Sequence, residues 1–377
     1  EHYGITFAKP VIDLAKMQES VHGIVAKLTG GLGQLCKARK IQFIRGRANF
    51  EDSSTLKITK ESGEQELLTY KNAILSVGSR PAILEKLLLD SPHVMNSTTA
   101  LQMDDIPETL LVVGGGYIGL ELGSVYAALG TKVTVIEAAP SLLQGADADL
   151  VEPLARRMET VMHKIILNGK VVGMKEVKKG IKVSMEGPGT EQRDETFDKV
   201  LICIGRKPNS SGIGLKNTNV QVDPRGFVVV DAQRRTTDPN IFAIGDIVGN
   251  PMLAHKASHE GRVAAEVIAG RNVVFAPRAI PAVVFTDPEI AWCGLTETQA
   301  AQEKRAVNVA RFPWKASGRA ATIDRPEGLT KILADPDTDV VLGVGIAGSG
   351  AGELIAEAVL AIEMGARASD IHLKIGR

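Results

Sequence analysis

The stretch from Leu110 to Glu137 places three glycines between an apolar run and a helix-like segment, and it ends in a carboxylate. Gly114, Gly116 and Gly119 have the spacing G-x-G-x-x-G, which after a strand and before a helix binds a dinucleotide pyrophosphate. The first glycine permits a tight turn, the second lets backbone approach the phosphates, and the third lets the helix pack closely on the sheet. The helix N-terminus then favours the negative charge. The segment predicts a dinucleotide-binding site.

Glu137 follows the second apolar run, where a carboxylate accepts hydrogen bonds from both ribose hydroxyls of a dinucleotide. No arginine follows it closely, which favours NAD over NADP. The apolar residues of the intervening helix recur at helical spacing and predict its buried face: Ile118, Leu122, Val125 and Leu129.

Another apolar run, more than 100 residues farther along the chain, ends in Gly245 and Asp246. It again predicts a carboxylate at the edge of a sheet, where α/β proteins bind ligands. Two such strand ends suggest two cofactors.

The three cysteines, Cys36, Cys203 and Cys293, lie far apart. This sparse, odd number fits a reducing compartment, and the apolar surroundings of the latter two predict core residues rather than a redox centre.

At 377 residues the chain is long enough for two or three domains. The 44 basic residues balance the 44 acidic ones, which argues against nucleic acid or an anionic membrane as a partner. No uninterrupted apolar run is long enough to predict a membrane span, and no cluster of side chains has metal-ligand spacing.

The remaining pattern predicts a helix from about 11 to 28, ended by Gly30 and Gly31, and then short strands between 40 and 77, beginning with IQFIRG. Further helices are expected near 148–162 and from 255 to a cap at Gly270. From about 279, short strands, paired strands at 329–347 and a helix near 352–364 predict a separate α+β domain.

Several motifs together resemble the flavin disulfide reductases. Residues 237–246 match T-x-x-x-x-F-A-x-G-D, whose aspartate contacts the flavin's ribityl chain in that family, and residues 249–261 resemble those of its dihydrolipoyl dehydrogenases. Three other segments are similar to family motifs: 77–81 near FAD, 205–209 closing the NAD site, and 286–292 opening the dimerisation domain. The resemblance covers essentially the whole chain.

The resemblance implies an α/β fold with two Rossmann-like, three-layer domains for FAD and NAD, the NAD domain being inserted in the FAD domain, plus a C-terminal α+β dimerisation domain. The expected divisions are a partial FAD domain at 1–106, the NAD domain at 107–235, a return to the FAD domain at 236–278 and a truncated dimerisation domain at 279–377.

Residues matching the family's cofactor contacts follow by position. For NAD they are Gly114, Gly115, Gly116, Tyr117, Ile118, Gly119, Glu121, Glu137, Val171 and Gly205. For FAD they are Ala48, Val77, Gly78, Ser79, Asp246, Met252, Leu253, Ala254 and His255. By itself, His255 is more typical of a surface or capping residue, and His259 with Glu260 of a solvated or structural face.

The implied reaction oxidises protein-bound dihydrolipoamide through an enzyme disulfide and FAD, and reduces NAD⁺. The implied partners are a second copy of the chain and the lipoyl domain of a 2-oxoacid dehydrogenase or glycine cleavage complex. The expected location is the cytoplasm, or the mitochondrial matrix for a eukaryotic source. No metal is expected.

The family's FAD glycine motif and its C-x-x-x-x-C redox pair align upstream of Glu1, and its His-Pro-x-x-x-x-Glu segment aligns beyond Arg377. His372 precedes the expected catalytic histidine and is interpreted as a surface residue. We therefore expect no catalytic residue in this chain, and no partner for Glu121, which pairs with an upstream lysine in the family. Two alternatives remain open: an NAD-binding, dimerising remnant without catalysis, and a sister reductase that uses glutathione or mercuric ion with NADP.

Overall fold

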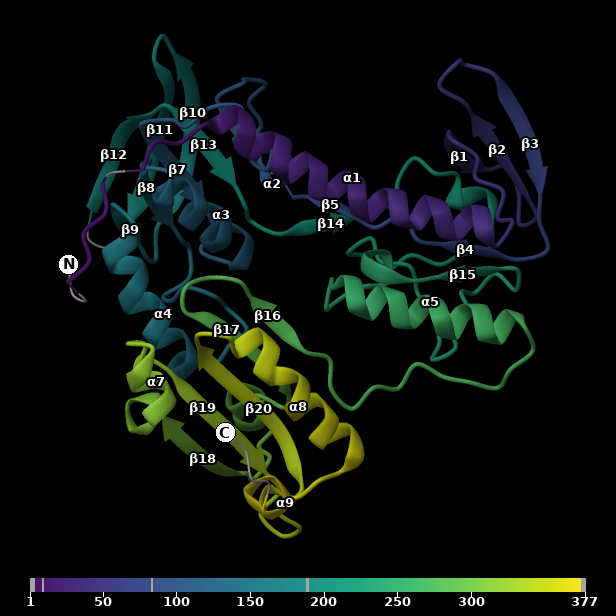
Figure 1. Ribbon diagram of the computed structural model, residues 1–377. Helices are drawn as coiled ribbons and strands as arrows, with labels where there is room; N and C mark the ends of the chain where they lie inside the picture. The colour runs from purple at the N-terminus through teal and green to yellow at the C-terminus, as the bar shows by residue number, and fades with distance from the viewer. Residues whose placement is uncertain (1–3, 9, 83, 188–189, 374–377) are drawn as a thin grey trace.

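The computed structural model describes residues 4–8, 10–82, 84–187 and 190–373. They form an α/β fold with a parallel-sheet unit, an antiparallel C-terminal domain, and a third group of smaller sheets beside the helices α1 and α5 (Figure 1). The chain leaves this third group after β5, builds the parallel-sheet unit, and returns at β14, which pairs with β5. Farther along the chain, β15 pairs with β4.

The parallel-sheet unit holds the glycine turn. Its five strands all run parallel, in the order β6 (Val94–Asn96), β13 (Lys199–Ile202), β7 (Thr109–Val113), β8 (Lys132–Ile136) and β9 (Lys164–Ile166). Helices α2 (Ser97–Ala100), α3 (Tyr117–Ala128) and α4 (Ala148–Val161) share an apolar cluster with one face of this sheet. An antiparallel sheet covers the other face, with strands β10 (Lys170–Val177), β11 (Gly180–Gly187) and β12 (Thr190–Phe197).

Strand β7 shows why the sequence before the glycine turn is continuously apolar. Leu110 and Val112 belong to the helix-side cluster, whereas Leu111 and Val113 belong to the cluster with the antiparallel sheet. Successive side chains of a strand point to opposite faces, and both faces of a parallel sheet are covered. The three-layer arrangement expected for this part of the chain is therefore present.

The predicted buried face of α3 is only partly right: of its four residues, Leu122 and Leu129 pack against the core cluster. The residues that the helix buries are Gly119, Leu120, Gly123 and Tyr126, whereas Val125 is exposed and the other three expected residues are only partly buried. The cause is the glycines: a methyl group on Gly123 would touch Val133 and Val112, so the sheet approaches the helix backbone itself. The core face follows this close approach rather than the spacing of the largest apolar side chains.

The C-terminal domain is an antiparallel sheet in the order β16 (Ala282–Val284), β17 (Glu289–Gly294), β20 (Val341–Gly348), β19 (Leu329–Ala334) and β18 (Asn308–Pro313). It also contains α6 (Glu297–Gln302), the turn η4 (Trp314–Ala316), α7 (Gly318–Thr322), α8 (Ala351–Met364) and α9 (Ala368–Leu373). Helix α8 packs on this sheet, and so does α4 of the parallel-sheet unit. Ile290 and Ala347 share one apolar cluster with Leu150 and Leu154 of α4, so the two parts have a continuous core.

The third group contains the residues expected to contact FAD. An antiparallel sheet is formed by β1 (Arg47–Phe50), β2 (Thr55–Thr59) and β3 (Gln65–Thr69), and β4 (Ala73–Leu75) pairs in parallel with β15 (Ile241–Ala243). The other elements are β5 (Ser79–Pro81) paired with β14 (Arg206–Pro208), α5 (Ala254–Ile268), and the turns η2 (Leu215–Asn217) and η3 (Gly245–Val248). The turn η1 (Glu85–Leu87) belongs to the parallel-sheet unit, because Leu87 packs in the apolar cluster between its two sheets. The expected strand IQFIRG is wrong, because pairing begins only at Arg47.

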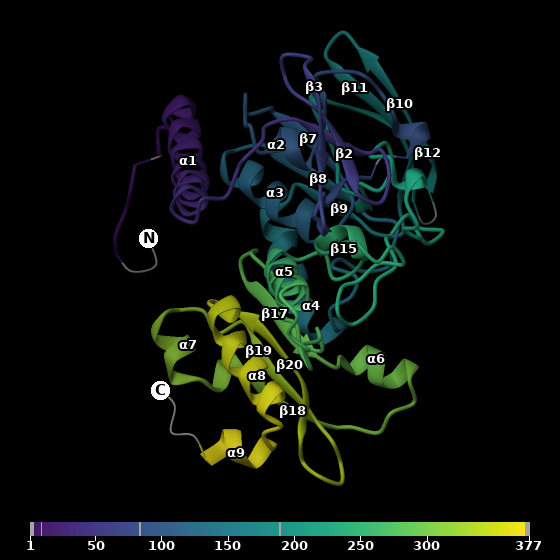
Figure 2. The same cartoon turned by 90° about the vertical axis from the view of Figure 1, so that its right-hand side faces the viewer.

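Helix α1 (Leu14–Ala38) is longer than predicted, and it stands at one side of the molecule in Figure 2. It continues through Gly30 and Gly31, because glycine weakens an exposed helix without ending it unless the backbone turns left-handed. That turn comes at Lys40, with φ 54°. Gln18 anchors the helix through its amide, which donates to the carbonyls of Gln102 and Met103 at 3.0 Å.

Five large apolar side chains of α1 are exposed: Ile24, Val25, Leu28, Leu32 and Leu35. Even so, none of the helices in the described part of the chain is both long and apolar enough to span a bilayer.

Candidate functional site

The glycine turn between β7 and α3 has the geometry that a pyrophosphate requires. Gly114 has φ +112°, and a Cβ there would lie 2.4 Å from the carbonyl oxygen of Cys203. A Cβ on Gly119 would lie 2.2 Å from the carbonyl oxygen of Gly114, whereas one on Gly116 would meet no atom within 4 Å. Gly116 also caps α3 without a side-chain hydrogen bond, which leaves the helix's first N–H groups open to a ligand. The turn thus fits a dinucleotide.

Glu137 comes directly after β8, beside this turn. Its Oε2 accepts the backbone N–H of Gly115 at 2.6 Å, and its Oε1 accepts that of Ala139 at 2.7 Å. The two bonds hold the carboxylate at the edge of the sheet, and each oxygen keeps a lone pair that a ribose hydroxyl can use. The position therefore agrees with the expected role of Glu137, which stays a prediction.

The other expected NAD residues lie in different surroundings. Ile118 is partly buried in the first turn of α3. Gly205 is exposed, with φ +120° and open space around it. Val171, in contrast, is 3% exposed and packs in the apolar cluster between the two sheets, so its side chain serves the core and only its backbone could face a ligand.

Asp246 lies in η3, at the end of β15, and forms a polar group with two residues from β5 and β14. Its Oδ2 accepts the hydroxyl of Ser79, which in turn accepts Nε–H of Arg206 at 2.7 Å. Nε of Arg206 also lies 3.8 Å from the carboxylate of Asp246. The sequence brings these residues together because β4 and β15 are neighbours, and this carboxylate edge fits the polar chain of a flavin cofactor.

The other expected FAD residues surround this group or lie farther along the third group of sheets. The carbonyls of Val77 and Gly78 accept hydrogen bonds from the side chain and backbone of Asn209. His255 is exposed, and its Nε2 lies 2.9 Å from the carbonyl oxygen of Pro281. The remaining residues lie on β1 or at the start of α5: Ala48 is exposed in β1, Met252 and Leu253 are partly buried, and Ala254 is exposed.

Tyr117 is affected electrostatically by the Asp246 group. It opens α3 directly after the glycine turn, yet its hydroxyl interacts with the charges of Arg206 and Asp246. Burial is the main reason that the pKa of Tyr117 is raised. The charges of the Asp246 group therefore act on the first residue of α3.

Glu121, one turn farther along α3, has a different partner from the one expected. Its Oε1 accepts the backbone N–H of Phe285 at 2.8 Å, and burial raises its pKa. It thus links α3 to the C-terminal domain.

The comparisons with known proteins agree with this arrangement. Residues 2–261 match the family model described as pyridine nucleotide-disulphide oxidoreductase, and residues 280–376 match that family's dimerisation domain. The chain belongs to this family. A dihydrolipoyl dehydrogenase of Haemophilus influenzae is 46% identical over 372 residues, covering 99% of this chain and 77% of the relative. One from Geobacillus stearothermophilus is 42% identical over 375 residues, covering 100% and 79%.

Two solved structures have a similar fold. LpdA from Mycobacterium tuberculosis superposes with a TM-score of 0.91 at 26% identity, covering 100% of this chain and 82% of that one. The HOCl-induced flavoprotein disulfide reductase RclA from Escherichia coli gives a TM-score of 0.86 at 25% identity, covering 97% and 83%.

The cysteines of this oxidoreductase chain are not arranged for disulfide chemistry. All three are free thiols, and burial raises the pKa of both Cys203 and Cys293 to about 12. A thiol reacts as its thiolate, so these two are inert at neutral pH. Cys293 is buried as predicted, whereas Cys203 is only partly buried.

A buried group of charges supports the turn that carries Asp246. Glu260 on α5 is fully buried, and it accepts the backbone N–H of Gly245 at 2.7 Å and a guanidinium N–H of Arg234 at 3.0 Å. The ammonium of Lys256 lies 3.1 Å from Glu260 and donates to the carbonyl of Gly249 at 3.2 Å. Sequence reasoning left Glu260 open as a solvated or structural residue, and the structure shows that it is structural.

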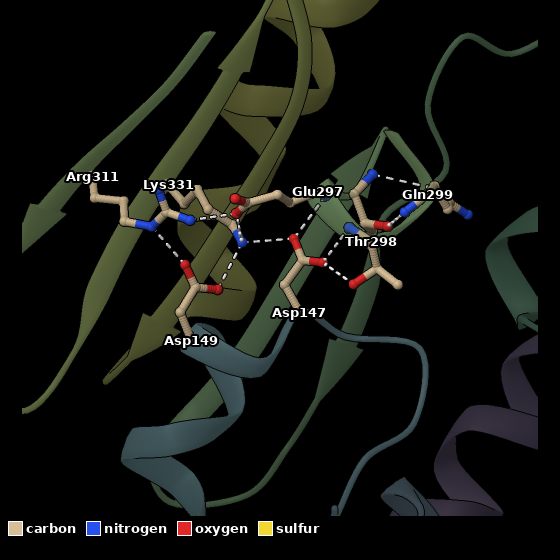
Figure 3. A network of polar contacts seen from close by, with 8 residues as sticks. Asp147, Asp149, Glu297, Thr298, Gln299, Arg311 and Lys331 are labelled. Carbon is tan, nitrogen blue, oxygen red and sulfur yellow. Dashed lines mark hydrogen bonds and ion pairs between the residues drawn. The ribbon is translucent and has the colours of Figure 1, made fainter. Parts of the chain in front are cut away.

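A second buried group of charges joins the parallel-sheet unit to the dimerisation domain, and no local sequence pattern predicts it (Figure 3). The fully buried Lys331 of β19 donates to Asp147 at 2.6 Å, to Asp149 at 2.7 Å and to Glu297 at 3.2 Å. Arg311 pairs with Asp149 at 2.7 Å and also with Glu297. The three carboxylates are close enough to hold a metal ion, but the ammonium of Lys331 already occupies the position between them.

The pH dependence of stability should reveal this network. Burial alone would raise the pKa of Asp147, but hydrogen bonds from Lys331, Thr298 and backbone N–H groups lower it to about 2 from 3.8. Because the pKa of Asp147 is lower in the folded state, its ionised form stabilises the fold by about 2 kcal/mol above about pH 4. This stabilisation is lost as the pH falls through about 2. Urea unfolding should therefore show Asp147→Asn destabilised by about this amount at pH 6, with the difference shrinking below pH 3. A difference that is the same at both pH values would contradict the assignment.

Proposed function

We propose that the protein containing this chain is a dihydrolipoyl dehydrogenase, which oxidises a protein-bound dihydrolipoamide to lipoamide and reduces NAD⁺ to NADH. The main support for this substrate class is the 40–46% sequence identity to curated dihydrolipoyl dehydrogenases over 98–100% of the chain. The geometry supports this interpretation, because the chain carries both a glycine turn that fits a dinucleotide and a carboxylate at Asp246 that fits the polar chain of a flavin. FAD and NAD⁺, when bound, would supply the hydride chemistry between them.

The residues of this chain would bind and orient the cofactors. The turn at Gly114, Gly116 and Gly119 would hold the pyrophosphate of NAD, and Glu137 would accept the hydroxyls of its adenosine ribose. Asp246, fixed by Ser79 and Arg206, would hold the flavin's ribityl chain. We propose the division of domains given above on the same grounds.

The sulfur chemistry requires groups that this chain does not contain. Its three cysteines include no C-x-x-x-x-C pair, and no His-Pro-x-x-x-x-Glu segment occurs in it. We propose that residues 1–377 alone bind NAD without turning over dihydrolipoamide. The dimerisation domain supports a homodimer, and we propose a lipoyl domain as the reaction partner. The bacterial sources of most relatives support a cytoplasmic location.

Two proteins should be assayed side by side: the chain as given, and the chain expressed with its native flanking coding sequence. The longer protein should be yellow and should form NADH at 340 nm from dihydrolipoamide and NAD⁺, whereas the 377-residue chain should form none. Preference of the longer protein for glutathione disulfide with NADPH would favour a sister reductase. Turnover by the 377-residue chain itself would contradict our account of the sulfur chemistry.

A further inference from the structure

The loop between β8 and α4 forms a wall beside the dinucleotide turn. It begins after Glu137 and runs from 138 to 147. The backbone N–H of Leu143 donates to the carbonyl of Gly115 at 2.9 Å, and a Cβ on Gly115 would lie 2.7 Å from the side chain of Leu142. Both leucines are 3% exposed. Any displacement of this loop would therefore displace Gly115, and with it the N–H that holds the Glu137 carboxylate.

The other end of the loop is fixed by the dimerisation domain. Asp147 is the last loop residue before α4, and its Oδ1 accepts the backbone N–H of Thr298 at 2.9 Å, while its Oδ2 accepts that of Glu297 at 2.9 Å. Lys331 adds a charged hydrogen bond of 2.6 Å from a neighbouring strand. In Figure 3 the loop and the start of α4 approach this strand, with Lys331 between Asp147 and Asp149.

In the described part of the chain, Lys331 is the cation that forms an ion pair with Asp147. Arg311 lies within pairing distance of Asp149 and Glu297 but forms no ion pair with Asp147. The side chain of Asp147 is 6% exposed, so water cannot replace a lost ammonium without moving the loop. The Thr298 hydroxyl also donates to Asp147 at 2.7 Å, but it carries no charge.

We propose that Lys331 is a positioning residue for the nucleotide site, which acts from the dimerisation domain through Asp147 and the 138–147 loop. It holds Gly115 and Glu137 in the arrangement that receives the adenosine half of NAD. This inference rests on the NAD site proposed above. It implies that the dimerisation domain is needed for full nucleotide affinity as well as for assembly.

The test measures binding by the 377-residue chain, so it does not depend on activity. The affinity for ADP-ribose is measured by calorimetry, and that for NADH by its fluorescence, in the wild type, Lys331→Met and Asp147→Asn. Ile355→Ala is the matched control, because Ile355 is buried in α8 of the same domain and lies outside the network. Circular dichroism establishes that each variant is folded.

Lys331→Met should weaken ADP-ribose binding about tenfold or more, and Ile355→Ala should change it less than about twofold despite its loss of stability. If Lys331→Met does not fold, Asp147→Asn decides, because Lys331 keeps two carboxylate partners there; the expected loss is about threefold to tenfold. Unchanged affinity in the folded network variants would overturn the inference. A wild-type chain that binds neither ligand would instead overturn the proposed NAD site.

Discussion

Glu260→Gln should lower the free energy of unfolding by about 3–5 kcal/mol, because it removes the charge of a buried carboxylate. The carboxylate is fully buried and neutralises Arg234 and Lys256, whose side chains are 14% and 5% exposed. Removing its charge leaves both cations without their shared counter-ion. A buried charge without a partner costs far more than an exposed ion pair contributes.

The same substitution should loosen the turn that carries Asp246. The backbone N–H of Gly245 donates to Glu260, and Lys256 donates to the carbonyl of Gly249, so the buried group holds both ends of η3. Hydrogen exchange of the peptide around residues 241–249 should accelerate in Glu260→Gln.

A control on the same helix makes the test specific. Glu266 pairs with Arg262 and Arg271, whose side chains are 77% and 69% exposed, so Glu266→Gln should cost less than about 1 kcal/mol. Urea unfolding followed by circular dichroism measures both. Equal midpoints for the two variants would show that the buried group contributes little to stability.

Gly119→Ala should disrupt both the fold of the nucleotide turn and NADH binding. The added methyl would lie 2.2 Å from the carbonyl oxygen of Gly114 and 3.0 Å from a methyl of Val112. Because one neighbour is backbone of the turn itself, the helix must move away from the sheet. We expect a loss of about 1–3 kcal/mol in stability and of about tenfold or more in NADH affinity.

Gly116→Ala is the informative comparison, since a Cβ there meets no protein atom within 4 Å. It should fold with nearly wild-type stability and still lose NADH binding, because its methyl occupies the space where the pyrophosphate approaches. Thermal unfolding and an NADH titration on both variants separate the two effects. Normal NADH affinity in Gly116→Ala would mean that the pyrophosphate lies elsewhere.

The sequence predicted the nucleotide turn because context, rather than glycine spacing, carries the signal. Gly343, Gly345 and Gly348 have the same G-x-G-x-x-G spacing, but they lie in the antiparallel strand β20. There the missing side chains make room for Leu150 against Gly345 and for Trp314 against Gly348. Only the glycines followed by a helix and a second strand with a terminal carboxylate form a cofactor turn.

What the sequence could not predict depends on contacts between distant segments. Lys331 and Asp147 are 184 residues apart, and neither belongs to a local sequence pattern that predicts an ion pair. The buried face of α3 is only partly predictable, because backbone approach at Gly119 and Gly123 decides which side meets the sheet. Helix α1 ends beyond its predicted end, because exposed glycines do not by themselves terminate a helix.

The most direct test of the account is a comparison of NADH and NADPH binding to the 377-residue chain. The N–H groups of Gly115 and Ala139 hold the carboxylate of Glu137 in place. If this carboxylate binds the ribose, as proposed, the 2′-phosphate of NADPH would face a fixed negative charge. We predict that NADH binds about tenfold tighter or more than NADPH, and that Glu137→Ala reduces this preference. Equal or tighter binding of NADPH by the wild type would contradict the assignment of this site to NAD.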